Sequence, residues 1–257
     1  MPSSYTALGP ADAPAIVFVH GTRLSRGMWQ PQLAALAGQF RVVALDLPGH
    51  GALRDRPFRW DAAVEEVVRV IDEAAGGRAV LVGLSLGGYV AMDVAARHPE
   101  RVAGLVISGA STEPAGPLGL PIRAFAAILE RVPVRTLDRL SRTWFRWRYP
   151  TTTAQATLAG GFAFEGGVDA LRELRRRRFG PALASYRGPV LVLNGQLDLV
   201  FRLGQRRFCR ALPDVRVTIL RGATHLANLD RPSAFSARIA RFARFARFAA
   251  EASTGDS

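Results

Sequence analysis

The sequence contains no lysine, so all 34 of its basic residues are arginine. Such uniform use of arginine is typical of GC-rich codon usage, which makes the formal net charge of +13 weak evidence for a polyanionic partner. No nucleic-acid-binding motif accompanies the charge. We therefore expect a small-molecule substrate and no nucleic-acid partner.

Other features that are rare or missing in the sequence indicate the cellular location of the protein. A lone cysteine, Cys209, cannot form an internal disulfide, which agrees with a reducing compartment. No apolar run reaches the roughly 18 to 20 residues that a membrane-spanning helix needs. Residues 1–15 also lack the basic and apolar regions of a secretory signal. These observations predict a cytoplasmic protein without a membrane span, and they leave the oligomeric state open.

Strand and helix patterns alternate along most of the chain. Continuous apolar runs, as opposed to alternating ones, are typical of strands buried on both faces of a parallel sheet. Such runs occur at 15–19, 41–45, 79–83, 102–108, 189–194 and 215–220, and helical patterns separate them at 28–37, 61–75, 86–97, 202–212 and 233–250. The alternation predicts an α/β fold with a mostly parallel sheet and helices on both faces. Its ligand site is expected beyond the carboxyl ends of the strands.

The segment 112–186 interrupts this alternation. It has no convincing strand pattern, and its helical patterns lie near 121–132, 134–147 and 168–179. We expect a helical cap here, inserted into an α/β core formed by residues 1–111 and 187–257. Its aromatic side chains either hold the small core of the cap itself or line a substrate pocket.

The C-terminal run 238–249 carries arginine and phenylalanine at three-residue spacing. At the pitch of an α-helix this spacing drifts around the axis and does not hold one narrow stripe. The run suits a helix on a membrane surface or a final helix packed on the sheet, with arginine stems extending to water. We favour the packed helix.

The most informative motif is Gly83-Leu84-Ser85-Leu86-Gly87, between a predicted strand and a predicted helix. A sharp strand-to-helix turn with flanking glycines presents a serine hydroxyl at the edge of the sheet, where it can act as a nucleophile. Serine is also favoured at the N-cap of a helix, which is the structural alternative. Because a strand precedes it and a helix follows it, Ser85 is the predicted nucleophile.

A serine nucleophile needs a general base and an acidic residue that orients the base. His225 is the predicted base, because it follows the last strand and gives the chain order serine, acid, histidine that accompanies this turn. Asp198, at the end of the preceding strand, is the predicted acid, and Glu113 is the alternative. The backbone amides of Thr22 and Leu86 are the predicted donors of the oxyanion hole.

Four side chains are candidates for contact with the substrate: Arg23, Trp29, Trp144 and Phe162. Arg23 follows the predicted oxyanion donor and is suited to hold an acidic group, because a guanidinium matches a carboxylate in a bidentate geometry. A solvent-exposed arginine is the alternative.

At these residues the sequence resembles the α/β-hydrolase superfamily, in its cap-bearing esterase, lipase and C–C hydrolase branch. The resemblance covers nearly the whole chain except the cap and implies no metal or organic cofactor. Its start departs from the family pattern, so the usual opening hairpin is expected to be missing or reduced to Tyr5–Leu8, in a sheet of about six to eight strands. The matching landmarks are Phe18-Val19-His20-Gly21, Trp29, Asp46-Leu47-Pro48-Gly49-His50-Gly51, Gly83 to Gly88, Gly195-Gln196-Leu197-Asp198, Gly222-Ala223-Thr224-His225, Pro232 and Phe235.

The predicted activity is hydrolysis of a carboxylic ester or thioester of a small to medium, partly apolar substrate through an acyl-enzyme. The same three residues would also support C–C bond hydrolysis, lyase or cofactor-free perhydrolase chemistry. A non-catalytic ligand-binding homologue is a third alternative, because a fold does not fix a function. Serine in place of aspartate in the turn argues against the halide-displacing and epoxide-opening relatives.

Overall fold

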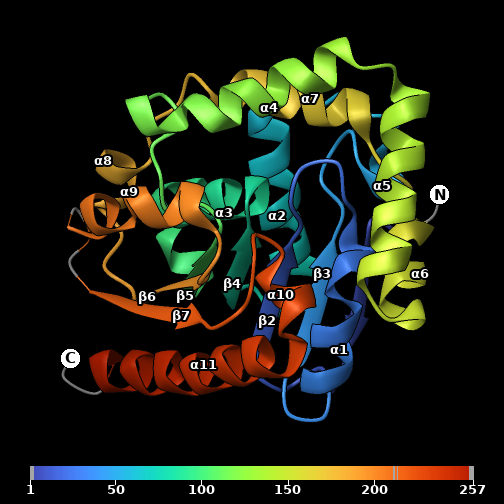
Figure 1. Ribbon diagram of the computed structural model, residues 1–257. Coiled ribbons are helices and arrows are strands. Elements are labelled where there is room, and N and C mark those ends of the chain that lie inside the picture. Colours follow the sequence, from blue (N-terminus) through green and yellow to red (C-terminus); the bar gives the residue numbers. More distant parts are fainter. Residues whose placement is uncertain (1–2, 211, 213, 255–257) are drawn as a thin grey trace.

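A twisted sheet lies at the centre of the molecule (Figure 1). The computed structural model describes residues 3–210, 212 and 214–254. Within them the strand order is β1-β3-β2-β4-β5-β6-β7, with β1 antiparallel to β3 and the other strands parallel. The strands are β1 (Tyr5–Leu8), β2 (Ala15–Val19), β3 (Arg41–Leu45), β4 (Ala79–Leu84), β5 (Val102–Ser108), β6 (Val190–Gly195) and β7 (Val215–Leu220).

The predicted strands agree with the observed strands to within one residue at each end. The continuous apolar pattern has the expected cause, because every residue of β2, β4 and β6 is buried. The opening hairpin is reduced to β1 alone, which pairs Tyr5 with Leu45 and Leu8 with Val42. The described sheet therefore has seven strands, within the predicted range.

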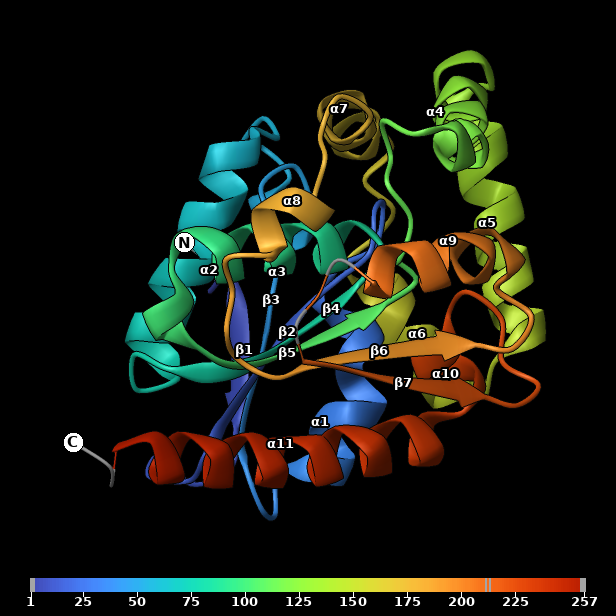
Figure 2. The same cartoon turned by 90° about the vertical axis from the view of Figure 1, so that its left-hand side faces the viewer.

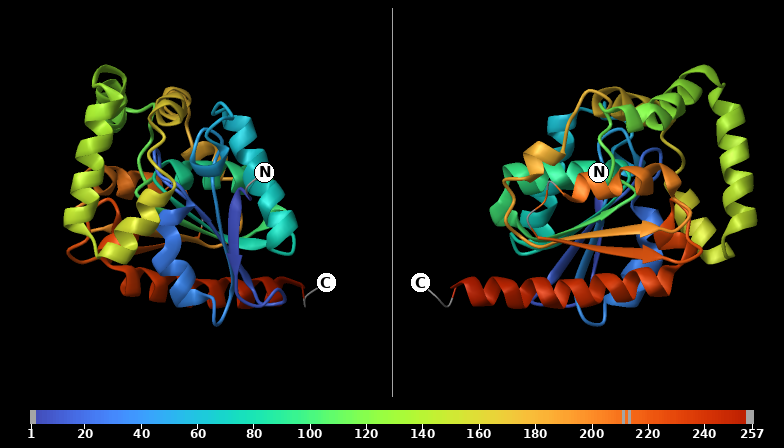
Figure 3. Two further views of the ribbon diagram at one scale, coloured as in Figure 1. Left: turned by 90° about the vertical axis from the view of Figure 1, so that its right-hand side faces the viewer. Right: turned by 60° about the vertical axis from the view of Figure 1, so that its left-hand side comes forward.

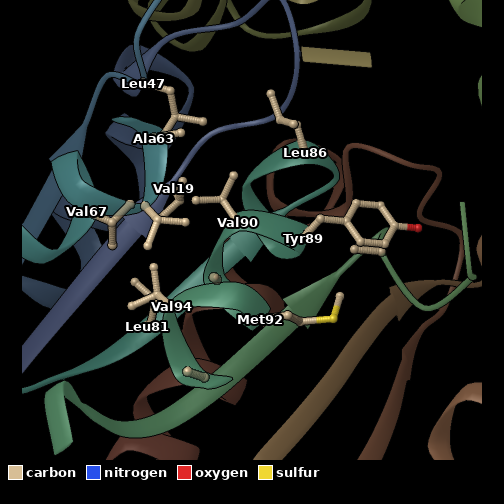
Figure 4. Close-up of a cluster of buried hydrophobic side chains, with 14 of the residues drawn as sticks. Val19, Leu47, Ala63, Val67, Leu81, Leu86, Tyr89, Val90, Met92 and Val94 are labelled. Atoms are coloured by element: carbon tan, nitrogen blue, oxygen red, sulfur yellow. The ribbon is translucent and has the colours of Figure 1, made fainter. Parts of the chain in front are cut away.

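Helices cover both faces of the sheet, and each face has its own hydrophobic cluster. Val17 and Val19 of β2 pack on the side of α2 (Trp60–Ala74) and α3 (Leu86–Arg97). Figure 4 shows part of this cluster, where Val19 and Leu81 meet side chains of these two helices. Ile16 and Phe18 point to the opposite cluster, which contains residues of α1 (Gln30–Leu36) and α11 (Pro232–Thr254). The remaining helices outside the 112–186 segment are α9 (Leu199–Cys209) and α10 (Ala227–Asp230), with short 3-10 turns at Arg26–Trp29, Gly51–Leu53 and Pro99–Arg101. A further 3-10 turn, Pro117–Gly119, lies within that segment.

The arginine- and phenylalanine-rich run forms α11, which packs on the sheet as favoured. Ile239, Phe242 and Ala243 are buried in the cluster beneath the sheet, while Arg241 and Arg244 are exposed. Phe248 and the other side chains beyond 246 lie outside the described residues. In the part of the chain that the structure describes, no helix is both long and apolar enough to cross a membrane.

Five helices occupy the 112–186 segment between β5 and β6. In Figures 1, 2 and 3, α4 and α7 lie on the side of the molecule opposite α11, and α5 runs down one flank. The bounds are α4 (Leu120–Arg131), α5 (Val134–Arg148), α6 (Thr151–Ala159), α7 (Phe164–Leu174) and α8 (Gly180–Leu183).

The sequence pattern predicted α4 and α5 but missed three features of this segment, one of which is the four-residue helix α8. It missed α6, because a threonine-rich helix without an amphipathic pattern gives no periodic signal. It also placed the next helix too late, since α7 begins at Phe164 and ends before the arginines at 175–178.

Candidate active site

Ser85 occupies a strained turn between β4 and α3. Its backbone is left-handed, with φ 55° and ψ −119°, which is rare for a residue with a Cβ. The turn is tight, since a Cβ added at Gly83 would lie 2.2 Å from the carbonyl oxygen of Gly87. Ser85 makes no side-chain hydrogen bond to cap α3, so the N-cap alternative does not account for it. The hydroxyl is left facing a cavity at the edge of the sheet.

His225 and Asp198 are joined by a hydrogen bond. Asp198 follows β6 and is nearly buried, and its Oδ2 lies 2.9 Å from Nδ1 of His225, in the loop after β7. The carboxylate does not cap α9, although the residue stands at the N-cap position. A Nδ1–H donated to Asp198 leaves Nε2 as the nitrogen that accepts a proton.

Two further residues, Phe201 and Gly109, pack against the imidazole of His225. The ring of Phe201 stacks on that of His225, with centroids 5.0 Å apart and planes at 20°. On the other side Gly109, with φ 57°, leaves room for the pair, because a Cβ there would lie 2.6 Å from Cε1 of His225. Ring orientation is thus fixed by packing as well as by the hydrogen bond to Asp198.

Glu113, the alternative acid, has a different set of partners. Its carboxylate accepts hydrogen bonds from the backbone amides of Phe179 and Gly180, at 3.0 and 2.6 Å. These contacts hold the start of α8. Of the two candidate acids, Asp198 is the one that contacts His225 in this structure.

The other histidines lie elsewhere. His20 and His50 are fully buried with ring centroids 5.0 Å apart, and neither lines the cavity that contains Ser85. Burial is the main cause that lowers the pKa of His20 to about 4 and that of His50 to about 3. His98 lies at the C-terminal end of α3 and is not part of that cavity.

A cavity of about 560 Å³ brings the three predicted triad residues together. Among the described residues the Ser85 hydroxyl has no hydrogen-bond partner, and it and His225 share the cavity without a direct hydrogen bond between them. Catalytic hydrogen bonds are often long before substrate binds. The walls are mostly apolar and come from both sides of the cavity: Gly21, Thr22, Arg23, Leu24, Leu84, Tyr89, Pro121, Ile122, Phe125, Leu140, Ser141, Trp144, Phe145, Leu171, Leu174, Val200, Phe201 and Leu226.

The fold and the turn at Ser85 suggest a relationship to a known protein family, and a match to the model of that family establishes it. The model described as "Alpha/beta hydrolase family" matches residues 16–238, which is most of the chain. The chain belongs to the α/β-hydrolase family.

Similar proteins are named as lactonases and esterases, which are hydrolases. A 3-oxoadipate enol-lactonase of Acinetobacter baylyi is 27% identical over 91% of this chain and 90% of its own. A pimeloyl-[acyl-carrier protein] methyl ester esterase of Nitrosomonas europaea is 28% identical over 87% of this chain and 93% of its own. The enol-lactonase structure from Burkholderia xenovorans superposes with a TM-score of 0.77 at 25% identity, covering 93% of this chain and 95% of that one. The protein is therefore a hydrolase.

The two residues of this α/β-hydrolase that are predicted to donate to the oxyanion lie near Ser85. Thr22 lines the cavity, and its hydroxyl lies 3.4 Å from the carbonyl oxygen of Gly167 in α7. Leu86 is the first residue of α3, directly after Ser85. Within the described part of the chain, neither amide has a hydrogen-bond partner.

The four predicted substrate contacts of the α/β-hydrolase separate into two groups. Arg23 and Trp144 line the cavity. Trp29 does not, because it is fully buried beneath the sheet against Phe18, with ring centroids 5.0 Å apart. Phe162 is also absent from the cavity wall and packs within the 112–186 segment against Phe145, with ring centroids 5.6 Å apart. An aromatic side chain can line a cavity or pack in the hydrophobic core, and the sequence alone does not distinguish these places. The prediction therefore included residues of both kinds.

Sequence reasoning missed a residue that holds the loop of His225. The carboxylate of Asp230 is buried and accepts hydrogen bonds from the amide and hydroxyl of Thr224, at 2.7 and 2.5 Å. It also contacts Arg148 and Tyr149 at the end of α5, at 2.6 and 3.2 Å. No sequence pattern marks it, because its partners are set by tertiary packing. Gly109 did have a signal, as a glycine directly after a buried strand.

Proposed function

We propose that the protein is a serine hydrolase that cleaves carboxylic esters or thioesters of small to medium, partly apolar substrates. The observation that carries the proposal is the Asp198–His225 hydrogen bond at a cavity that Ser85 also lines in a left-handed turn. The mostly apolar wall favours an acyl or alcohol group of the same character.

The reaction proceeds through an acyl-enzyme. Ser85 Oγ attacks the carbonyl carbon while its proton passes to Nε2 of His225, and Asp198 stabilises the resulting imidazolium. The amides of Thr22 and Leu86 donate hydrogen bonds to the carbonyl oxygen as it becomes negative. The alcohol or thiol leaves with the proton from His225. A water then loses a proton to His225 and attacks the acyl-enzyme, which releases the carboxylic acid and restores the serine hydroxyl.

In this proposal the 112–186 segment is a cap on a core of residues 1–111 and 187–257. Leu140, Trp144 and Phe145 of α5 and Leu171 of α7 line the cavity, opposite Ser85 and His225 from the core. The segment would thus select the substrate, while the core supplies the reacting groups.

A fluorophosphonate probe tests the nucleophile. Cleavage after Arg78 and Arg97 yields a tryptic peptide, 79–97, in which Ser85 is the sole serine. We expect the label on this peptide in the wild type and no label in Ser85→Ala, together with hydrolysis of short acyl p-nitrophenyl esters by the wild type alone. Labelling of another peptide, or equal turnover by Ser85→Ala, would contradict the assignment.

A further inference from the structure

Arg23 places a cationic side chain in an otherwise apolar part of the cavity. Its guanidinium carbon lies 5.0, 5.9 and 5.6 Å from the ring centroids of Phe125, Phe162 and Phe164. The nearest polar partner is Ser141, whose Oγ is 3.4 Å from Nη1, while the buried Nε has no hydrogen-bond partner in the described structure. Aromatic faces attract a cation but accept few of its five N–H hydrogen bonds. Within the described structure, Nη1 of Arg23 therefore has one hydrogen-bond partner and the buried Nε has none.

The charge of Arg23 also lacks an acidic counterpart. No carboxylate of the described residues lies within 4.0 Å of it, whereas Arg26 and Arg148 each pair with a buried aspartate. Burial lowers the pKa of Arg23 to about 10, so the side chain stays protonated at neutral pH. A partly buried charge without an acidic partner is less well solvated than one in water, and an anion that binds there restores favourable contacts.

The backbone around Arg23 is shaped to hold this side chain. Arg23 and Ser85 are the two non-glycine residues of the described chain with positive φ, at 65° and 55°. The carbonyl of Arg23 accepts a hydrogen bond from the amide of Ala163 at 2.9 Å, and a Cβ at Gly167 would lie 2.8 Å from Cγ of Arg23. A left-handed conformation is less favourable for arginine than for glycine, because arginine has a Cβ. Strain of this kind is concentrated at functional sites.

We propose that Arg23 binds a carboxylate of the substrate, so that the enzyme acts on esters or thioesters that carry a second, acidic group. The inference rests on the proposed function, because it names the substrate class of the same cavity. Arg23 directly follows Thr22, the proposed oxyanion donor, and both line the cavity with Ser85. The acidic group and the scissile carbonyl are therefore joined by an apolar spacer that lies along the hydrophobic wall. A guanidinium is the cation best matched to a planar carboxylate.

The competing explanation is structural, in which Arg23 only attaches the cap to the core through its aromatic contacts. The two explanations differ in what Arg23→Met does, because methionine keeps much of the apolar stem and removes the charge. A structural role predicts equal effects on acidic and neutral substrates. A carboxylate-binding role predicts loss on acidic substrates alone.

The kinetic test compares esters that differ in one group. Monomethyl esters of dicarboxylic acids with four to eight carbons are assayed beside methyl esters of fatty acids of equal length. For the best acidic ester, Arg23→Met should lower kcat/KM about 10- to 100-fold, mainly through KM, and leave the neutral ester within about twofold. Arg23→Lys should recover part of the loss, since it restores charge without the planar fork.

Arg142→Met is the matched control. Arg142 lies 5.9 Å from the ring of Phe162, as Arg23 does, but is paired with Asp138 at 2.7 Å and does not line the cavity. This variant should leave both ester series unchanged. Equal loss on acidic and neutral esters in Arg23→Met, or no loss on any acidic ester, would overturn the proposal.

A binding measurement separates this inference from the proposed catalysis. In the Ser85→Ala background, calorimetry with the dicarboxylates from succinate to suberate should give at least one ligand that binds about tenfold more weakly when Arg23 is methionine. If Ser85 is labelled by fluorophosphonate but no dicarboxylate distinguishes the variants, the carboxylate site is wrong and the serine mechanism stands. If Ser85 is not labelled but Arg23 determines dicarboxylate binding, the mechanism fails and the site stands.

Discussion

Asp198 and Glu113 are two carboxylates near the cavity whose roles single substitutions can separate. Asp198→Asn keeps the shape of the side chain but removes the acceptor charge that fixes the tautomer of His225. We expect kcat for ester hydrolysis to fall roughly 10³- to 10⁴-fold with the fold retained. Glu113→Gln weakens the contacts with Phe179 and Gly180 at the start of α8 and should change kcat by less than about fivefold. The reverse ranking of the two variants would make Glu113 the orienting acid.

Gly109 provides a test of how strongly packing fixes His225. An alanine methyl there would lie 2.6 Å from Cε1 and 2.8 Å from Nδ1 of His225, which displaces the ring from Asp198. We expect Gly109→Ala to lower kcat about 100-fold or more. Gly76→Ala is the control, because Gly76 also has a positive φ, 66°, but has open space around its Cβ position. If both variants lose stability by about 1 kcal/mol and keep activity, the contact with His225 has no catalytic consequence.

The buried histidines His20 and His50 make stability depend on pH. Both pKa values lie below the ordinary value of 6.5, mainly because burial disfavours the charged ring. Below pH 6.5 the unfolded chain thus binds more protons than the folded protein, so the free energy of unfolding decreases as the pH falls from about 6.5 towards about 4. The limiting slope is about 1.4 kcal/mol per pH unit for each histidine.

Urea denaturation at pH values from 7 to 5 measures this dependence. The wild-type free energy of unfolding should fall by several kcal/mol over this range, and His50→Gln should roughly halve the slope. His98→Gln serves as the control, because it removes a partly exposed histidine at the end of α3 and leaves the buried pair in place. A slope that is equal in His50→Gln and wild type would exclude the buried pair as its source.

Among individual residues, those that could be predicted from the sequence are the ones marked by chain order and by a local turn. Ser85, Asp198 and His225 all follow strands of a parallel sheet, whose carboxyl ends meet at one edge, so their convergence on one cavity follows from the strand pattern. Trp29 and Phe162 were misplaced because an aromatic side chain buries equally well in a core and in a pocket. The aromatic environment of Arg23 was not predictable, because it depends on how the 112–186 segment packs.

At the scale of elements, Asp230 connects the end of α5 to the loop that carries His225. Its carboxylate bonds Thr224 on one side and Arg148 and Tyr149 on the other. Burial and the charge of Asp230 raise the pKa of Tyr149 above its ordinary value, so its hydroxyl stays protonated and can donate this bond. The position of the helix and that of the imidazole loop are thereby coupled.

Arg148→Met should change substrate binding more than chemistry. It removes the ion pair with Asp230 but leaves the hydrogen bonds that Tyr149 and Thr224 donate to this carboxylate, so we expect KM to rise about three- to tenfold with kcat within about threefold. Asp230→Asn weakens both sets of contacts and should lower kcat as well. Arg146→Met, an exposed neighbour on α5, is the control. Equal effects of the Arg146 and Arg148 variants would show that the ion pair with Asp230 does not position the helix.

Helices and strands could be predicted from the sequence where their buried residues follow a regular pattern. Strands such as β2 and β4, with every residue buried, are visible as continuous apolar runs and were located to within one residue. The helix α6 was not predicted, because its sequence lacks a strong amphipathic pattern. Ala154, Thr157 and Leu158 are nevertheless buried in the structure by tertiary contacts. Tertiary packing determines such an element more than its own sequence does.

At the scale of the whole molecule, the 112–186 segment does not have a separate hydrophobic core. Phe164 and Leu171 of α7 belong to the cluster that contains Val64 and Val90 of α2 and α3. Phe145, at the end of α5, belongs to the other cluster, under the opposite face of the sheet. Because burial of apolar surface drives folding and is shared by both parts, neither part is expected to unfold alone.

Tryptophan fluorescence and circular dichroism test this expectation. Trp29 and Trp60 are fully buried in the core, whereas Trp144 and Trp147 lie on α5 and are 41% and 79% exposed, so replacing the exposed pair by phenylalanine costs little stability. In this double variant tryptophan fluorescence reports only on Trp29 and Trp60, while far-ultraviolet circular dichroism also reports on the helices of the 112–186 segment. We expect one urea transition with the same midpoint by both probes. A helical signal lost at lower urea than the core fluorescence would identify the cap as an independent folding unit, and the shared clusters would then contribute less to its stability than their burial implies.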